Sequence, residues 1–141
     1  PAMMFVTCLC ALLDPASGRL RFANAGHDLP YRLTAAQPVE LRAVGMPLGL
    51  LTGMAYEEQE AVIQPGEKLA LYSDGLVEAH NPIREMFGFP RLRDILAEYS
   101  DGQGANGGNL IDYLMAQLAD FTGPGWEQED DVTLVVVERS S

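Results

Sequence analysis

Positive charge, cysteine and long apolar runs are all scarce in this sequence. Nine lysine and arginine residues stand against twenty aspartate and glutamate residues, which gives a formal net charge of −11. Such an excess of negative charge repels nucleic acid and anionic lipid, so we expect neither as a partner. The apolar runs, such as residues 132–137, are of strand length and much shorter than a membrane span. The composition fits a protein that binds a cation or a basic partner, although a solvated acidic surface would give the same composition.

Cys8 and Cys10 are the only cysteines. At i and i+2 of a strand they share a face but cannot easily form a disulfide, so we expect two buried free thiols and a reducing compartment, the cytoplasm. A Cys-x-Cys metal site would need further thiols or clustered histidines, which the sequence lacks. The first residues also lack an initiator Met and the basic start of a signal peptide. We therefore expect this chain to be cut from a longer protein.

With 141 residues, 48% of them hydrophobic, the chain is long enough for one domain with its own core. The apolar run 3–13 predicts a buried strand, and residues 14–18 carry the Asp, Pro and Gly of a turn. Residues 19–25 alternate, with Leu20 and Phe22 on one face, so the three segments predict a hairpin. Further strands of an antiparallel meander are predicted at 31–33, 39–44, 55–63 and 68–73.

The remainder of the sequence changes to a helical period. Residues 90–99 have an amphipathic pattern, with Pro90 near the first helical position. After a glycine-rich loop at 100–108, Asn109 is predicted to cap a second helix. The apolar stripe of that helix, predicted to be core, consists of Leu110, Ile111, Leu114, Met115 and Leu118. A closing strand at 132–138 completes a pattern of strands, two helices and a last strand, which indicates an α+β fold.

Three carboxylates stand at the ends of predicted strands. Asp74 follows one apolar strand directly, and Asp130 and Asp131 precede another. If the two strands are antiparallel neighbours, Asp74 and Asp130 lie close enough to repel each other unless a cation or a proton intervenes. Sites made only of oxygen ligands suit Mg²⁺ or Mn²⁺. Gly75 is expected to allow a sharp or left-handed turn that points Asp74 outward. The alternative is structural, because Asp-Gly is a common turn dipeptide and paired aspartates can simply solvate a loop.

Six segments follow one another along most of the chain in the order typical of a known family. They are 4-MFVT-7, 14-DPASGRLRFANAGH-27, 47-PLGL-50, 65-PGEKLALYSDGLVEAHN-81, 86-MFGFPRL-92 and 130-DDVTLVVV-137. Any one of them would be a weak signal, whereas six in register are a strong one. Together they resemble the metal-dependent protein serine/threonine phosphatases of the PP2C superfamily, in the bacterial branch typified by the sporulation phosphatase SpoIIE and the stress phosphatase RsbU.

This resemblance implies a fold of two packed antiparallel sheets flanked by helices, an antiparallel β-sandwich of the α+β class. In the family, strand-end aspartates hold two Mn²⁺ or Mg²⁺ ions, so Asp74 and Asp130 resemble metal ligands that are catalytic through metal-activated water. Asp131 is implied as an accessory metal ligand. The N-terminal Gly-Asp motif of the family, whose aspartate bridges both metals, does not occur here. We therefore expect residues 1–141 to be a partial domain that lacks its N-terminal portion and is weak or inactive alone.

The resemblance also implies a reaction and partners. The reaction is hydrolysis of phosphoserine or phosphothreonine on a regulatory protein, and the implied substrate is a phosphorylated anti-sigma-factor antagonist of the STAS type. Such domains usually follow a sensor or receiver domain, which would lie upstream. An open sheet edge could also pair two chains as a homodimer. The rival interpretation is a non-catalytic regulatory binding module of the same fold.

Other polar residues have two possible roles each. His27 lies in the segment 26–28, Gly-His-Asp, where relatives often have Gly-His-Asn. It could be a general acid, but a loop histidine that hydrogen-bonds its own turn is the preferred interpretation. Glu78, four residues after Asp74, could add a carboxylate to the site, although a surface position is preferred. Three glutamates of one predicted strand are expected to be a solvated edge: Glu57, Glu58 and Glu60.

Overall fold

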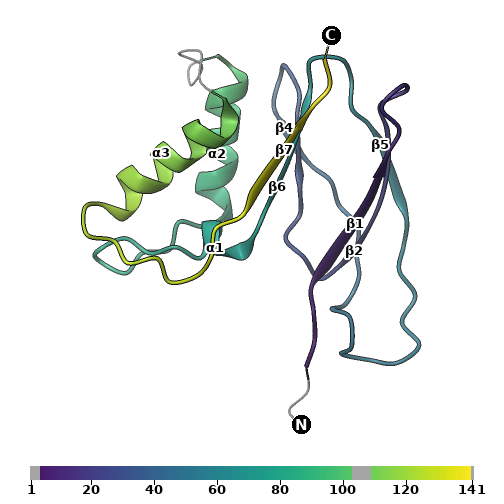
Figure 1. Ribbon diagram of the computed structural model, residues 1–141, viewed down its shortest axis with the longest axis horizontal. Helices are drawn as coiled ribbons and strands as arrows, with labels where there is room; N and C mark the ends of the chain where they lie inside the picture. Colours follow the sequence, from purple (N-terminus) through teal and green to yellow (C-terminus); the bar gives the residue numbers. More distant parts are fainter. Residues whose placement is uncertain (1–3, 103–108, 141) are drawn as a thin grey trace.

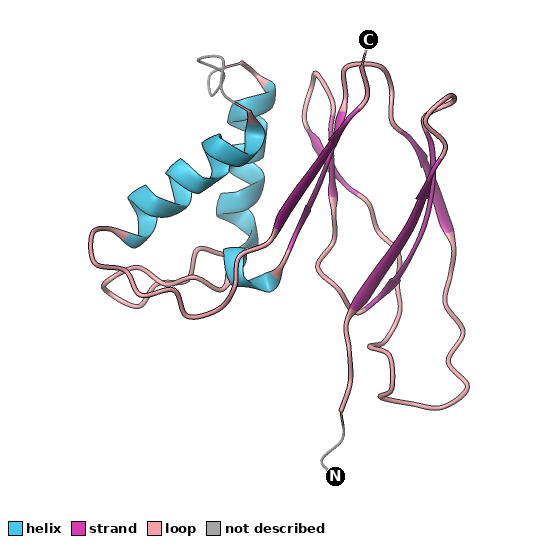
Figure 2. Ribbon diagram, viewed as in Figure 1, coloured by secondary structure: helices cyan, strands magenta, loops and turns pink. Residues whose placement is uncertain are grey.

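The computed structural model describes residues 4–102 and 109–140, and residues 103–108 of the glycine-rich loop predicted at 100–108 lie outside them. The elements in chain order are β1 (Cys8–Leu13), β2 (Arg19–Ala25), β3 (Tyr31–Leu33), β4 (Pro38–Glu40), β5 (Gln59–Val62), β6 (Lys68–Tyr72), α1 (Asp74–Val77), α2 (Phe89–Ser100), α3 (Leu110–Thr122) and β7 (Leu134–Glu138). Figures 1 and 2 show three layers: the helices α2 and α3, the sheet with β6 and β7, and the sheet with β1 and β2. The predicted antiparallel β-sandwich flanked by helices is therefore confirmed.

The strand order differs from the predicted meander. One sheet has the order β1-β2-β5 and the other β4-β3-β6-β7, with antiparallel pairing throughout. The predicted hairpin of β1 and β2 is present, but β5 returns to pair with β2 and β6 then pairs with β3. The chain therefore changes sheet after β2, after β4 and again after β5. Each sheet buries its apolar face by packing on the other.

β6 lies at the centre of the molecule because both of its faces are covered. Leu69 is buried in a cluster between the two sheets, together with Leu20 and Phe22 of β2. Ala70 and Tyr72 point the other way, into a second cluster that the helices complete. Successive residues of a strand face opposite sides, so this five-residue strand joins both cores. The residues directly after β6 therefore start from a rigid position.

The helices begin close to where the sequence predicts. Pro90 lies in the first turn of α2, and the Asn109 side chain caps α3 by accepting a hydrogen bond from the Asp112 N–H at 2.9 Å. The predicted core stripe of α3 is only partly correct, because Ile111 and Met115 are 37% and 41% exposed. Leu110, Leu114 and Leu118 are buried, so the apolar stripe of α3 is wider than the part of the helix that is covered. None of the helices in the described part of the chain is long and apolar enough to cross a membrane.

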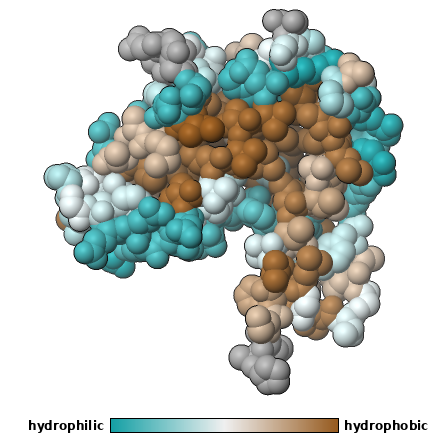
Figure 3. Space-filling view, viewed as in Figure 1, coloured by the Kyte–Doolittle hydropathy of each residue, from teal (hydrophilic) through white to brown (hydrophobic). Residues whose placement is uncertain are grey.

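The prediction that the first apolar run is a buried strand is wrong. β1 is the edge of its sheet, with β2 as its one neighbour there, and Leu12 is 61% exposed. Cys8 and Cys10 are free, as expected, but Cys8 is half-buried and Cys10 exposed. An unbroken apolar run predicts a strand covered on both faces, and the described residues do not cover β1 in that way. Figure 3 shows the result, an apolar surface across the side of the molecule that carries α3, β7 and β1.

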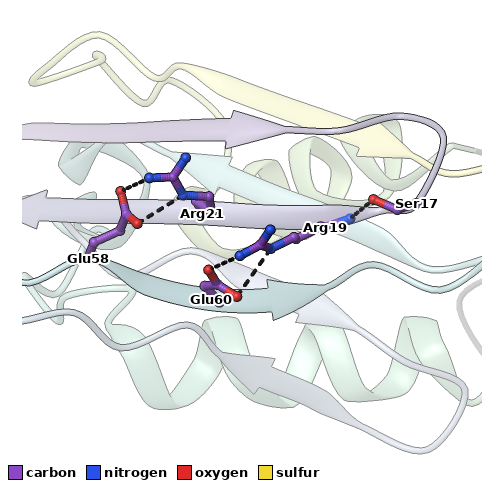
Figure 4. Close-up of polar contacts among 5 residues, drawn as sticks. All are labelled: Ser17, Arg19, Arg21, Glu58 and Glu60. Carbon is purple, nitrogen blue, oxygen red and sulfur yellow. Dashed lines mark hydrogen bonds and ion pairs between the residues drawn. The ribbon is translucent and has the colours of Figure 1, made fainter.

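The outer face of β2 carries a ladder of ion pairs with the residues in and before β5 (Figure 4). The Arg21 guanidinium donates two hydrogen bonds to the Glu58 carboxylate, at 2.9 and 2.8 Å, and Arg19 pairs with Glu60 in the same way. Glu58 and Glu60 are exposed, as expected for a solvated edge, but each is also paired with an arginine. The ladder aligns β5 with β2.

We expect the Arg21–Glu58 pair to contribute little to stability. Both side chains are about half exposed (45% and 50%), and exposed pairs of this kind contribute roughly 0.2–1 kcal/mol. A double-mutant cycle of Arg21→Ala and Glu58→Ala, measured by urea unfolding, should therefore give a coupling free energy below about 1 kcal/mol that 1 M salt reduces further. A coupling free energy well above this bound, insensitive to salt, would contradict the assignment of the ladder as a surface feature.

Candidate metal centre

The end of β6 and the beginning of β7 are adjacent, as the sequence predicts. The two strands pair antiparallel, with Tyr72 opposite Leu134. Beyond this pair Ser73 continues the contact: its N–H donates to the Thr133 carbonyl at 3.0 Å, and its hydroxyl accepts from the Thr133 N–H at 2.9 Å. The same hydroxyl donates to the Asp131 carbonyl at 3.0 Å. Ser73 therefore fixes Asp74 beside the segment that carries Asp130 and Asp131.

Gly75 lets the two segments approach closely. A Cβ atom at this position would lie 2.4 Å from the Asp131 carbonyl oxygen and 3.0 Å from the Asp131 carbonyl carbon. The expected reason for this glycine, a sharp or left-handed turn, is wrong: Gly75 lies in the short helix α1 and is not among the residues with positive φ. The glycine is required because there is no room for a side chain.

The carboxylates that the sequence singled out occupy different positions at this junction. Asp74, in the first turn of α1, is exposed. Glu78 is also exposed, as preferred from the sequence, yet it lines the same hollow of about 420 Å³ as Asp130. The hollow is bounded by Gly75, Glu78, Ala79, His80, Met86, Trp126, Glu129 and Asp130. Neither Asp74 nor Asp131 lines the hollow. Asp131 is exposed and contacts Ser73 and Asp130 through its main chain.

Glu129 is an acidic residue of the hollow that the chain itself neutralises. Its carboxylate is 2.9 Å from His80 Nδ1 and accepts a hydrogen bond from Arg84 at 2.7 Å. These two contacts, His80 first, lower the pKa of Glu129. Of the three acidic residues of the hollow, Glu129 is paired with His80 and Arg84. The negative charges of Glu78 and Asp130 therefore remain for a cation.

The loop with His27 and Asp28 lies against the end of β6. The buried Asn24 side chain accepts from the His27 N–H at 2.7 Å and donates to the His27 carbonyl at 2.9 Å. The Tyr72 hydroxyl donates to the Leu29 carbonyl at 2.9 Å. In these bonds it is the main chain of His27, and not its ring, that holds the turn. The loop is thereby held against Tyr72, which precedes Asp74 by two residues in the sequence.

Asp28 is the residue of this region that the sequence did not single out. It is half-buried, and its Oδ2 atom is inaccessible to solvent and without a hydrogen-bond partner. Burial raises the pKa of the Asp28 carboxyl; His27 opposes this shift, and the negative charges of Asp74 and Glu78 add to it.

The carboxylates near the end of β6 have the chemistry that a hard divalent cation prefers, but they do not form a complete site. Asp28, Asp74, Glu78 and Asp130 all offer carboxylate oxygens, the ligands that Mg²⁺ and Mn²⁺ prefer. The solvent-inaccessible Asp28 oxygen is a group that a cation would satisfy. Within residues 4–102 and 109–140, however, no three His, Cys, Asp or Glu side chains converge so as to hold a metal ion on their own. The described residues fit one part of a metal site.

The sandwich with aspartates at its adjoining strand ends defines a PP2C-like domain of the SpoIIE/RsbU type. The chain belongs to the family described as Stage II sporulation protein E (SpoIIE), which it matches over residues 1–140. Among curated proteins it is 28% identical over 139 residues to Protein IcfG of Synechocystis, and 27% identical over 144 residues to the phosphoserine phosphatase RsbU of Bacillus subtilis. The alignments include 97% and 98% of this chain but only 21% of IcfG and 40% of RsbU, so the chain spans less than half of either relative.

Solved structures have the same fold. The chain is similar to the crystal structure of the RsbU and RsbW domains of Rv1364c from Mycobacterium tuberculosis, with a TM-score of 0.70 and 26% identity over 95% of this chain and 36% of that one. It is also similar to the phosphatase domain of SpoIIE from Bacillus subtilis, presoaked with Mn, with a TM-score of 0.69 and 20% identity over 96% of this chain and 56% of that one. The second similarity is one of fold alone.

Proposed function

We propose that this chain is part of a metal-dependent protein serine/threonine phosphatase domain that hydrolyses phosphoserine or phosphothreonine on a regulatory protein. The observation that carries the proposal is the junction at Gly75, which brings Asp74 beside the segment of Asp130 and Asp131. The likeness to RsbU, whose name is phosphoserine phosphatase, supports this class of reaction.

In this proposal Asp74 and Asp130 hold the metal, Mn²⁺ or Mg²⁺, with Asp131 as an accessory ligand and two ions in the complete domain. A bound divalent cation lowers the pKa of a coordinated water and neutralises charge on phosphoryl oxygens. Other residues of the chain position these proposed ligands. Ser73 fixes the segment of Asp131 against the end of β6, and Gly75 leaves room for that segment. A cation is also what allows an acidic surface to accept a phosphate dianion.

We propose that the remaining ligands lie in polypeptide outside residues 1–141, because these residues lack the Gly-Asp motif that the resemblance implies and cover only 40% of RsbU. The 141-residue chain alone is then weak or inactive. In the same proposal the protein is cytoplasmic, its substrate is a phosphorylated STAS-type antagonist of an anti-sigma factor, and a sensor or receiver domain precedes it. The apolar side with the open edge of β1 supports a homodimer as a further proposal.

The rival is a binding module that docks a regulatory partner without cleaving it. A binding module has no need of carboxylates at adjoining strand ends, whereas a site for a divalent cation does. The retention of both Asp74 and Asp130 therefore favours catalysis.

Removal of the metal is the experiment that tests the proposal. Phosphate release from a phosphoserine protein or peptide by the full-length protein should need Mn²⁺ or Mg²⁺, fall to background in EDTA, and return when metal is added in excess. The 141-residue chain, assayed beside it, should release little or none. If the folded full-length protein releases no phosphate with either metal, the binding module is the correct interpretation, and release that EDTA leaves unchanged would exclude the metal-dependent mechanism.

A further inference from the structure

We infer that Glu129 is a positioning residue of the proposed phosphatase: His80 and Arg84 hold its carboxylate, and the adjacent Asp130 is thereby fixed at the place proposed for the cation. The inference rests on the proposed function in one respect, that Asp130 is a metal ligand. It adds the loop of residues 80–86, which lies between α1 and α2, to the parts of the chain that build the site.

The segment that carries Asp130 is irregular and has few attachments. Residues 123–133 lie between the end of α3 and the beginning of β7 and form neither helix nor strand. Trp126 packs against the core on the helix side. Among the described residues, Glu129 is the one member of the stretch 124–130 that hydrogen-bonds outside the segment. The contacts of Glu129 therefore decide where the second half of the segment lies.

Asp130 lies between two residues that are held in place. Before it, both oxygens of the Glu129 carboxylate are used: one lies 2.9 Å from His80 Nδ1, and the other accepts from the Arg84 guanidinium at 2.7 Å. After it, the Asp131 carbonyl accepts a hydrogen bond from the end of β6 at 3.0 Å. A metal ligand binds well only when the groups around it fix its orientation. The two neighbours of Asp130 supply this support.

The loop that holds Glu129 has a defined shape. Asn81 and Glu85 close it: the Asn81 N–H donates to the Glu85 carbonyl at 3.0 Å, and the Asn81 side chain accepts from the Glu85 N–H at 2.8 Å. In the described part of the chain, Arg84 is the one residue other than glycine with a positive φ, 65°. Such a conformation costs free energy, so the surrounding contacts have to maintain it. From it the guanidinium reaches Glu129, 45 residues further along the chain.

A surface ion pair without further role accounts less well for these contacts. The pair of Arg19 and Glu60, for example, joins β2 and β5, two strands that main-chain hydrogen bonds already align. Glu129 belongs to a segment that has no such ladder, so its side-chain contacts do what the main chain does elsewhere. Exposed ion pairs add little to global stability, and the effect of this pair is therefore expected at the neighbouring ligand.

Arg84→Gly separates positioning from charge. Glycine adopts a positive φ readily, so the loop keeps its shape while the contact with Glu129 is lost. Electrostatics alone predicts stronger binding of a cation, because the variant removes a positive charge. A positioning role predicts the opposite: Mn²⁺ binding weakens roughly 10-fold in Arg84→Gly, and roughly 10- to 100-fold in Glu129→Ala, which loses both contacts.

The affinity is measured by the loss of the EPR signal of free Mn²⁺ on titration into the full-length protein. Arg84→Lys, which keeps a charged donor for Glu129, should recover most of the affinity. The matched control is Arg42→Ala. Arg42 is as exposed as Arg84, 77% against 72%, and is also 2.7 Å from its glutamate, Glu40. Its loss should leave Mn²⁺ binding unchanged.

Thermal unfolding of the metal-free protein completes the test. A positioning role predicts that the midpoint of Arg84→Gly stays at the wild-type value while Mn²⁺ binding weakens. Weaker binding that goes with a lower midpoint would overturn the inference in favour of a structural contact. Wild-type Mn²⁺ binding that Asp130→Asn abolishes and Arg84→Gly leaves equal or stronger would overturn the inference alone. Absence of Mn²⁺ binding by the wild type would overturn the proposed function with it.

Discussion

Asp74→Asn is expected to reduce the Mn²⁺-dependent release of phosphate by the full-length protein on the order of 100-fold or more. Loss of a carboxylate that only supports a metal ligand already costs roughly 10- to 100-fold at known sites, and Asp74 is proposed to be a ligand itself. The exposed carboxylate makes the variant informative, because asparagine keeps the shape of the side chain in the first turn of α1. Metal-free stability should therefore change little, and activity should be lost without unfolding.

The two aspartates before β7 provide the comparison. Asp130 is proposed as a metal ligand like Asp74, whereas Asp131, whose carbonyl accepts the Ser73 hydroxyl, is proposed as an accessory ligand only. Asp130→Asn should therefore match the loss seen with Asp74→Asn, and Asp131→Asn should cost less than either. Initial rates at saturating Mn²⁺ and over a Mn²⁺ titration would distinguish weaker metal binding from slower chemistry. Equal rates for the wild type and Asp74→Asn, with both proteins folded, would remove Asp74 from the metal site.

The features that the sequence predicted well depend on local pattern. β2 is predicted from the alternation of Leu20 and Phe22 with arginine, and α3 is predicted from Asn109 before an apolar stripe. The contact of β6 with β7 is a longer-range prediction. It was made from Asp74 at the end of one apolar strand and Asp130 and Asp131 at the beginning of another. It was correct because antiparallel neighbours bring the end of one strand to the beginning of the other.

The features that the sequence could not predict depend on contacts between distant segments. The exposure of Leu12 follows from what packs on β1, and an apolar run alone does not specify this. The pairing of β5 with β2 depends on two sheets packing together, with the Arg21–Glu58 pair as one of its contacts. The one sign of Asp28 in the sequence was an aspartate where relatives often have asparagine. The position of its loop against β6 depends on the hydroxyl of Tyr72, 43 residues away from the Leu29 carbonyl to which it donates.

Gly75→Ala is expected to damage both the stability of the junction and its affinity for metal. The new methyl group would lie 2.4 Å from the Asp131 carbonyl oxygen, so the segment 130–131 has to move away from α1. Overpacking of this kind costs about 1–3 kcal/mol. The displacement also weakens the bond from the Ser73 hydroxyl to the Asp131 carbonyl, which is 3.0 Å long. Because Asp74 and Asp130 belong to the two segments that separate, Mn²⁺ affinity falls together with stability.

Hydrogen exchange locates the damage. The amides of Ser73 and Thr133, which bond across the junction, should lose protection in Gly75→Ala, and Mn²⁺ titration of the same sample should show weaker binding. The matched control is Gly53→Ala: nothing lies within 4 Å of its added methyl group, and its positive φ of 73° costs only local strain, about 1–2 kcal/mol. That variant should keep both the protection at Ser73 and the Mn²⁺ affinity. If Gly75→Ala keeps them as well, the close approach of the two segments is not what assembles the site, because the aspartates would then bind metal without it.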